Sequence, residues 1–359
     1  MSIAFLAAES VPALATFSWG ATAGLAGAPE PLVLANIPSP PQGVWQLGRI
    51  PIRGYAISIL LGLLAGIYLT SKRYAARGGN PELIMDIAIA VIPAGIIGGR
   101  VYHVLTDWPK YFGEGANPWD ALKITNGGLG IWGAVVFGVL AAWAVARWRG
   151  APFAPVLDAA APGIILGQAI GRLGNWFNQE LYGGPTELPW GLEIYQRVDE
   201  MGRLAPVTGT SNGIVLAVVH PAFLYEMIWN LLALAVLLWA DKKFRLGGGR
   251  VFALYVALYT LGRFFIELVR VDEATLIFGV RINNITSAVV FLGALVVLWL
   301  LRDKSREHPD QVRAGSDTPA GSNTGAATVT EAASGEAATS SSTAAISDAA
   351  ENRREATGK

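Results

Sequence analysis

Seven apolar stretches, separated by polar connections, follow one another through most of the chain. Each has close to the roughly 20 residues that a helix needs to cross a bilayer. The pattern therefore predicts an all-α polytopic membrane protein with seven transmembrane helices. The expected spans cover residues 55–70, 83–105, 129–146, 155–177, 221–240, 251–268 and 285–301. The first has a short apolar core, so we expect it to begin near Ile50.

Basic residues cluster after the first, third, fifth and seventh of these spans, and the connection 107–126 is poorer in them. Cytoplasmic loops of membrane proteins are enriched in lysine and arginine. This asymmetry predicts a multi-pass protein with its N-terminus outside and its C-terminus in the cytoplasm.

Three regions outside the spans differ in composition from the membrane body, residues 50–303. Residues 1–49 contain no lysine or arginine before Arg49, so we expect an extracytoplasmic N-terminal extension without a cleaved signal. Residues 178–220 predict a small extracytoplasmic cap with short strands near 190–195 and 213–219. Residues 304–359, rich in small and polar residues, predict a disordered cytoplasmic tail.

Composition narrows the possible chemistry. The chain is 52% hydrophobic and 15% charged, and its net charge of zero gives no argument for nucleic acid. It contains no cysteine, which excludes disulfides and a covalent intermediate on a protein thiol. With only three histidines, a multi-histidine metal site is not expected, and no cofactor is predicted.

The end of the fourth span carries a polar cluster. Gln168, Arg172 and Asn175 are spaced to share one helix face, and Asn178 and Glu180 extend it before a loop that includes Gly183. Polar and charged side chains are costly in hydrocarbon and usually mark a functional site. The alternative is a helix end whose polar groups only meet water and lipid headgroups.

The sixth span repeats this spacing with Arg263, Glu267 and Arg270. One interpretation is an intrahelical Arg263–Glu267 pair that stabilises packing. The other is an arginine that presents its planar guanidinium to a phosphate.

Other polar positions carry weaker signals. His220 precedes the fifth span and either orients the cap loop or touches substrate, and a structural role is the better interpretation for Tyr225 and Glu226. Tyr55 belongs either to the same outer layer or to an aromatic belt. Arg100 is a charge in the second span without an evident partner in sequence.

Two arginine-bearing helices in one outer layer point to an anionic lipid phosphate as ligand. The rival interpretation is a transporter or channel for an anionic solute. Such a path would need polar residues in the inner halves of the spans, and the stretches 62–69 and 135–146 are almost wholly apolar.

Four sequence blocks carry a resemblance to bacterial prolipoprotein diacylglyceryl transferases, over roughly residues 50–301. They are GRLGNWFNQELYG from Gly171 to Gly183, HPAFLYE from His220, LYTLGRFFIELVR ending at Arg270, and GGLGIWGA from Gly127. The resemblance implies a bacterial plasma-membrane enzyme that moves the diacylglyceryl group of phosphatidylglycerol to the lipobox cysteine of prolipoprotein signal peptides. A thioether forms and glycerol phosphate leaves, as the first step of lipoprotein maturation.

The same resemblance implies roles for individual residues. Phosphatidylglycerol would be bound by Arg172, Arg263, Asn178 and His220, amid other membrane lipids. The catalytic set would comprise Asn175, Glu180, Gly183, Arg263, Glu267 and Tyr55.

The chain departs from the family pattern at Trp132, where many members carry a histidine that has been proposed as general base. An indole cannot accept a thiol proton. Glu180, Glu267, His103 and His220 remain candidates for that role. A thiol is also partly ionised near neutral pH, and nearby arginines lower its pKa, so we favour electrostatic catalysis without a dedicated base.

Overall fold

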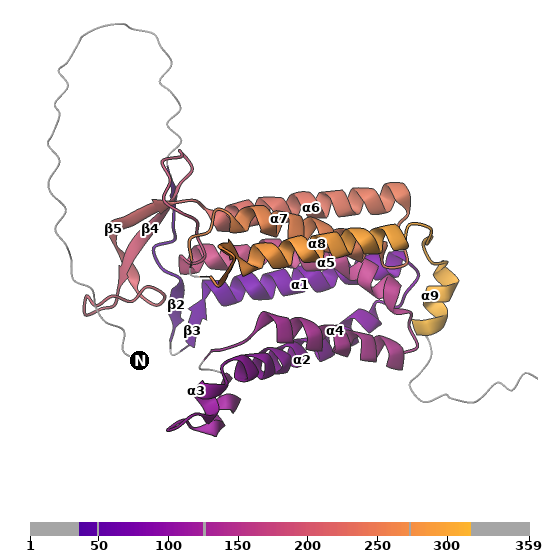
Figure 1. Cartoon of the computed structure of the whole chain (residues 1–359), viewed down its shortest axis with the longest axis horizontal. Helices are drawn as coiled ribbons and strands as arrows, with labels where there is room; N and C mark the ends of the chain where they lie inside the picture. The colour runs from indigo at the N-terminus through magenta and orange to yellow at the C-terminus, as the bar shows by residue number, and fades with distance from the viewer. Residues whose placement is uncertain (1–35, 49, 125–126, 273, 317–359) are drawn as a thin grey trace, which may run out of the picture. The chain divides into compact units, whose positions relative to one another are not determined.

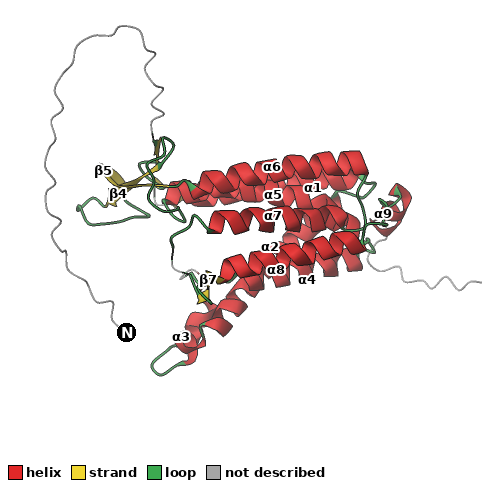
Figure 2. Cartoon of the chain, turned by 45° about the horizontal axis from the view of Figure 1, so that its top comes forward, coloured by secondary structure: helices red, strands yellow, loops and turns green. Residues whose placement is uncertain are grey.

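The computed structural model describes residues 36–48, 50–124, 127–272 and 274–316. Within these ranges, six helices are long and apolar enough to cross a membrane. They run side by side in two views (Figures 1 and 2). They are α1 (Gly54–Ala76), α2 (Glu82–Thr106), α4 (Ile131–Trp148), α5 (Phe153–Asn178), α6 (Ala222–Phe244) and α8 (Ile282–Leu300).

The sixth predicted span is also helical, as α7 (Arg250–Glu267). Its 18 residues include Arg250, Arg263 and Glu267. It packs against α5, α6 and α8. Length and composition alone therefore establish six candidate spans in the described residues. Helix α7 is not among them because it has no 18-residue stretch with fewer than three charged residues.

Two pairs of helices pack with their backbones in close contact. Gly62 and Gly66 of α1 face Gly167 and Gly163 of α5. A Cβ atom added at Gly62 would lie 2.6 Å from the Gly167 carbonyl oxygen, and one at Gly66 would lie 2.9 Å from that of Gly163. Small residues allow this close approach between membrane helices. In α2 and α4, Gly98 faces the carbonyl of Gly133 in the same way.

Strands gather at the end of the bundle where α1 begins. β1 (Ile37–Pro38), β4 (Leu192–Val198) and β5 (Thr210–Val219) form one sheet in the order β1-β4-β5, with β1 parallel and β5 antiparallel to β4. The two strands predicted near 190–195 and 213–219 are thus confirmed. Leu192, Ile194 and Val219 pack with Phe223 into a small core beneath the sheet.

The start predicted for the first span is wrong. Residues from Ile50 to Arg53 form β3, which pairs with β2 (Val44–Leu47), and α1 begins only at Gly54. The Gly54 amide donates to the Gly43 carbonyl at 2.9 Å. The hairpin therefore takes up apolar residues that the hydrophobic pattern alone would assign to the helix.

At the opposite end of the bundle, part of the tail that was predicted to be disordered is ordered. Residues 304–316 pack against the bundle and include α9 (Pro309–Ser316). Residues 317–359 of the tail and residues 1–35 of the N-terminal extension lie outside the described residues. Ser305 pairs with Leu246, and Val312 is fully buried beside Tyr74 and Leu83. The buried valine, the backbone pairing and the ion pair of Arg306 with Asp241 together hold this segment although its composition is polar.

Four short elements complete the fold: α3 (Trp108–Phe112), η1 (Pro118–Leu122), β6 (Leu276–Ile277) and β7 (Val280–Arg281). Arg100, which has no evident partner in sequence, anchors the connection after α3. Its guanidinium donates to five backbone carbonyls, including those of Ala121 at 2.7 Å and Gly127 at 2.6 Å. Arg100 is thus a structural residue that fixes the loop before α4.

Candidate active site

The polar end of α5 folds back on itself. The helix ends at Asn178, and Gln179 and Leu181 adopt left-handed backbone angles, with φ of 53° and 56°. This turn returns Glu180 to the helix, where its carboxylate accepts from Asn175 Nδ2 at 3.1 Å. Arg172 Nη1 in turn donates to Asn175 Oδ1 at 3.3 Å. The three side chains that were expected to act together therefore form one hydrogen-bonded chain.

Glu226 of α6 joins the two arginine-bearing helices. Arg172 Nε of α5 contacts Glu226 Oε2, and Arg263 Nη1 of α7 lies 2.7 Å from Glu226 Oε1. The Glu226 side chain is 7% exposed, whereas both arginines are 20% exposed. Sequence reasoning favoured a purely structural role for Glu226 and missed that it would hold both arginines.

Glu267 lies at the next position of the network and is completely buried. It is contacted by Arg263 Nη2 at 2.7 Å, Arg281 Nε at 2.8 Å and Asn283 Nδ2 at 2.9 Å. The intrahelical Arg263–Glu267 pair therefore exists, and the same arginine also reaches Glu226. Arg281 directly precedes α8 and Asn283 lies in its first turn. Neither was singled out from sequence, because polar residues before an apolar run usually indicate a headgroup contact.

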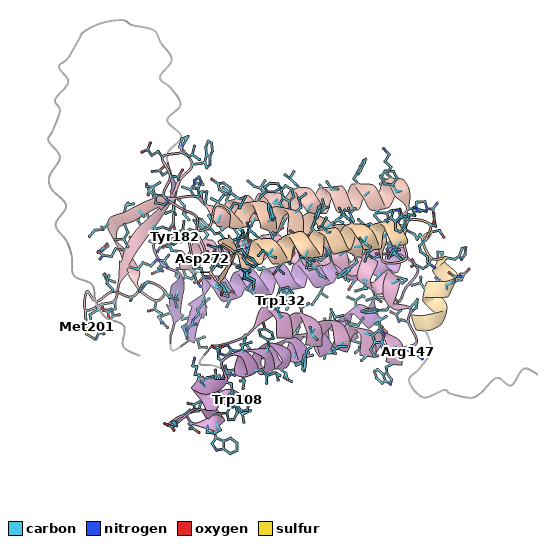
Figure 3. All side chains as sticks on the ribbon, in the orientation of Figure 1. Trp108, Trp132, Arg147, Tyr182, Met201 and Asp272 are labelled. Carbon is cyan, nitrogen blue, oxygen red and sulfur yellow. The ribbon has the colours of Figure 1, made fainter. Side chains whose placement is uncertain are left out.

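Arg270 does not continue the helical stripe. The helix ends at Glu267, and Arg270 instead forms a backbone bridge with Gly183. Its side chain pairs with Asp272 at 2.7 Å, and Arg281 lies 3.3 Å from the same carboxylate. The hydrogen bond from Arg270 and the nearby arginine charges lower the pKa of Asp272, so its carboxylate is ionised at neutral pH. Figure 3 labels Asp272 at the strand-bearing end of the helices.

Gly183 occupies a position where no side chain fits. An added Cβ would lie 2.7 Å from His220 Cβ and 2.9 Å from Val269 Cγ1. The Gly183 amide donates to the His220 carbonyl at 2.9 Å. Gly183 therefore ties the loop after α5 to both α6 and the end of α7, while the His220 ring lies 3.2 Å from the Tyr225 hydroxyl.

Two predicted site residues are near the network without bonding to it. The Tyr55 ring packs against Gly174, directly beside Asn175, since a Cβ at Gly174 would lie 2.7 Å from Tyr55 Cδ2. Asn178 is the last residue of α5. Within the described residues, neither side chain makes a hydrogen bond to the arginines.

The residues considered for proton transfer differ in their surroundings. His103 on α2 pairs with Asp107 at 2.9 Å. Trp132, labelled in Figure 3, begins α4 and is exposed. Glu267 is held by cations on several sides, whereas Glu180 accepts from a neutral amide. Across the described ranges, no three histidine or carboxylate groups lie together as metal ligands would.

The network retains donors for a ligand. Among the described residues, Arg172 Nη2 and Arg263 Nε have no partner, while the other nitrogens of both guanidiniums are engaged. Guanidinium groups bind phosphate oxygens with strong charge-assisted hydrogen bonds. The two partly exposed arginines can therefore bind an anion from two sides while Glu226 keeps them in place.

The chain was compared with known protein families and curated proteins. A family model described as prolipoprotein diacylglyceryl transferase matches residues 42–300. Proteins named phosphatidylglycerol–prolipoprotein diacylglyceryl transferase are similar throughout this region. The one from Corynebacterium glutamicum is 66% identical over 281 residues, which cover 78% of this chain and 89% of the relative. For Corynebacterium diphtheriae the identity is 62% over 75% of this chain and 95% of the relative, and for Mycobacteroides abscessus it is 52% over 77% and 81%.

Proposed function

Because this chain belongs to the prolipoprotein diacylglyceryl transferase family, we propose that phosphatidylglycerol reacts at the cluster of Arg172, Arg263 and Glu226. The chain is a membrane transferase of lipoprotein biosynthesis that moves the diacylglyceryl group of phosphatidylglycerol to a prolipoprotein. The names of the relatives support this activity and give no support to a transporter or channel for anionic solutes.

One observation carries the assignment of the site: arginines from two helices meet on a single buried carboxylate, and each keeps an unused N–H group. Arg172 Nη2 and Arg263 Nε bind the phosphodiester of phosphatidylglycerol. Glu226 holds both guanidiniums in position, so little of their conformational freedom remains to be lost on binding. Glu267 orients Arg263 from the other side and is in turn held by Arg281.

The reaction at this site exchanges one bond for another. The lipobox cysteine sulfur attacks the glycerol carbon of the diacylglyceryl group that bears the phosphate, and a carbon–sulfur bond forms. The carbon–oxygen bond to phosphate breaks, and its electron pair leaves with glycerol phosphate. The arginines stabilise the attacking thiolate and the departing phosphate. The thiol proton passes to water, or to Glu180, which is the least neutralised of the carboxylates considered.

The other predicted residues shape the place where the lipid binds. Asn175 positions Arg172 and Glu180 through its amide. Gly183 allows the loop to pack against His220, whose ring together with Asn178 and Tyr55 contacts the lipid headgroup region.

The proposal also covers the number of spans and the orientation of the chain in the membrane. The membrane body, residues 50–303, has seven spans, because α7 packs among other spanning helices and its charged residues lie near its two ends, where Arg263 and Glu267 are paired. The N-terminal extension 1–49 and the cap 178–220 lie outside, and the tail 304–359 lies in the cytoplasm.

The cysteine-free chain offers a direct test of this orientation. Met201→Cys should react with an impermeant maleimide on intact cells, whereas Lys304→Cys should react only after permeabilisation. The reverse pattern would overturn the orientation.

A reconstituted assay tests the site. The purified chain is mixed with phosphatidylglycerol and a peptide carrying a lipobox cysteine, and release of glycerol phosphate is followed. Wild type should release it only when the peptide carries the thiol, and Arg172→Gln should not. The matched control is Arg203→Gln, since Arg203 is an exposed cap arginine paired with Asp199. Equal rates in Arg172→Gln and the control would refute the assignment.

A further inference from the structure

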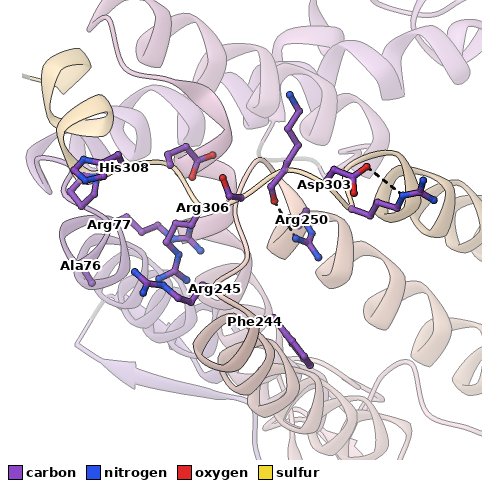
Figure 4. Close-up of a pocket in the computed structure, with 13 residues that line it drawn as sticks. Ala76, Arg77, Phe244, Arg245, Arg250, Asp303, Arg306 and His308 are labelled. Carbon is purple, nitrogen blue, oxygen red and sulfur yellow. Dashed lines mark hydrogen bonds and ion pairs between the residues drawn. The ribbon is translucent and has the colours of Figure 1, made fainter.

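A second basic cluster lies at the opposite end of the bundle, around a pocket of about 580 Å³. Figure 4 shows its labelled lining residues, which come from the ends of α1, α6, α7 and α8 and from the segment before α9. Six of the lining residues are arginine or lysine, and two are carboxylates. The pocket thus combines a hollow with an excess of positive charge, and the transfer reaction does not account for either.

The two carboxylates on the wall leave most of this charge unneutralised. Asp303 pairs with Arg302 at 3.4 Å, and Glu307 accepts from the backbone amide of Gly248 at 2.8 Å. Two of the cations are already used for packing, because Arg77 and Arg306 both bind the carboxylate of Asp241. These two arginines contribute charge to the pocket but few free donors.

Three other cations remain available. Among the described residues, the Arg245 and Lys304 side chains have no hydrogen-bond or ion-pair partner, and both are exposed. Arg250 is partly exposed, uses Nη1 on the Lys304 carbonyl at 3.2 Å, and makes no hydrogen bond through Nη2 within the described residues. Arg245, Arg250 and Lys304 come from three different segments and line one pocket.

We propose that this pocket binds a phosphate-bearing anion through Arg245, Lys304 and Arg250. Guanidinium and ammonium groups suit phosphate oxygens, which can accept hydrogen bonds from the unengaged nitrogens of these three side chains. The phosphate belongs either to the headgroup of an anionic phospholipid or to a soluble phosphate compound, since the pocket lies at the ends of membrane-spanning helices. This site is separate from the Arg172–Arg263 cluster and does not depend on the transfer mechanism.

Non-specific attraction of anionic lipids to basic residues must be distinguished from binding at a specific site. Basic residues near a membrane surface attract anionic lipids by about 1 kcal/mol each wherever they lie. Lys72 and Lys242 belong to the same end of the bundle, are exposed and do not line the pocket. The double variant Lys72→Gln/Lys242→Gln therefore removes the same charge as Arg245→Gln/Lys304→Gln and serves as its matched control.

The experiment counts ligands bound to the intact chain in neutral detergent by native mass spectrometry. Phosphatidic acid is one probe, and inorganic phosphate, followed by calorimetry, is the other. The Arg245→Gln/Lys304→Gln variant should carry one phosphatidic acid fewer than wild type. Its affinity for phosphatidic acid at the pocket should be at least about tenfold lower, because two charge-assisted contacts are removed. The control double variant should keep the wild-type number and affinity.

Each outcome decides the proposal. Loss of a lipid only in the pocket variant identifies a phospholipid headgroup as the ligand. Saturable phosphate binding that the pocket variant alone abolishes, without loss of lipid, identifies a soluble phosphate compound. Equal binding of both probes by wild type and the two double variants overturns the site. The unfolding midpoint of each variant shows that the fold is retained, and Lys304→Glu provides a second test by charge reversal at an exposed position.

Discussion

Both ends of α6 hold a buried carboxylate that binds arginines from other segments. At one end, Glu226 binds Arg172 and Arg263. At the other end, Asp241 binds Arg73 and Arg77 of the α1 region and Arg306 of the C-terminal segment. The chemistry of the two clusters is the same, and sequence composition would give them the same role.

The clusters differ in what their arginines hold. At Asp241, Arg77 and Arg306 each also donate to the Leu246 carbonyl, and Arg77 lies 3.8 Å from a second buried carboxylate, Asp158. Within the described residues, Arg172 and Arg263 contact side chains alone and keep unused donors. The Asp241 cluster therefore fastens chain segments to one another, whereas the Glu226 cluster is the one that we propose as the lipid site. Contacts to the backbone, and not charge, distinguish the two clusters.

The largest expected effect is on activity at the Glu226 cluster. Arg263→Ala should lower diacylglyceryl transfer by about 10²–10³-fold, because it removes a preorganised donor to the developing phosphate charge. The readout is glycerol phosphate release per folded enzyme. A variant that keeps more than half of wild-type activity would erase the proposed distinction between the two ends.

The corresponding change at the other end should affect stability. Asp241→Ala leaves buried Arg77 without its main partner, which costs about 3–5 kcal/mol when a buried pair is broken from one side. The unfolding midpoint in detergent should fall strongly, while the remaining folded protein transfers lipid normally. Asp303→Ala, at the exposed pair with Arg302, should leave the midpoint unchanged. A normal midpoint in Asp241→Ala would contradict the structural role.

Gly183→Ala should affect both properties moderately. The added methyl group collides with His220 and Val269, and such overpacking costs about 1–3 kcal/mol. The loop that positions Glu180 should shift, so transfer should fall while the lipid site still forms. Gly202→Ala is a useful control, because Gly202 has open space around it although its φ of 76° adds some strain. Equal behaviour of the two variants would show that the contact with His220 is unimportant.

Truncation after Lys304 should have a smaller effect, on stability alone. It removes the Arg306 contact to Asp241 and the buried Val312, and sequence composition would have judged this segment dispensable. We expect a lower unfolding midpoint than for truncation after Ser316, with transfer activity preserved. Identical midpoints for the two truncations would show that the contacts of residues 305–316 contribute nothing.

The smallest effect is expected at Trp132. Trp132→Phe should change transfer by less than about threefold, because an indole has no acceptor for a thiol proton and cannot serve as the base. Trp132→His introduces a side chain that can accept a proton at the same position. A large gain of activity in Trp132→His would show that a base at this position limits the rate.

Much of the fold followed from local patterns, because apolar periodicity reports directly on helices. The spacing of Gln168, Arg172 and Asn175 placed three polar groups on one helix face, and Asn175 does bond to Arg172. The partners across elements could not be predicted. Glu226 is far from Arg172 in sequence, and only the packing of α5 against α6 brings them together.

Two predictions failed for a common physical reason. Arg270 left the helix because the backbone around it pairs with Gly183 and Gly184. Ile50 left the first span because it pairs with Leu47. In both cases hydrogen bonds to a distant or preceding segment replaced the helical ones, and no local propensity reports on such a partner.

The glycine contacts between α1 and α5 have a consequence for how the two helices can shift. Gly62 and Gly66 meet Gly167 and Gly163 where no methyl group fits, so a slip along the axis would drive a larger side chain into a carbonyl. The next matching arrangement is four residues away, or about 6 Å of helix rise. Tyr55 therefore stays beside Gly174 when other helices of the bundle shift. A single-residue insertion in the first half of α1 would rotate Tyr55 by about 100° away from Gly174.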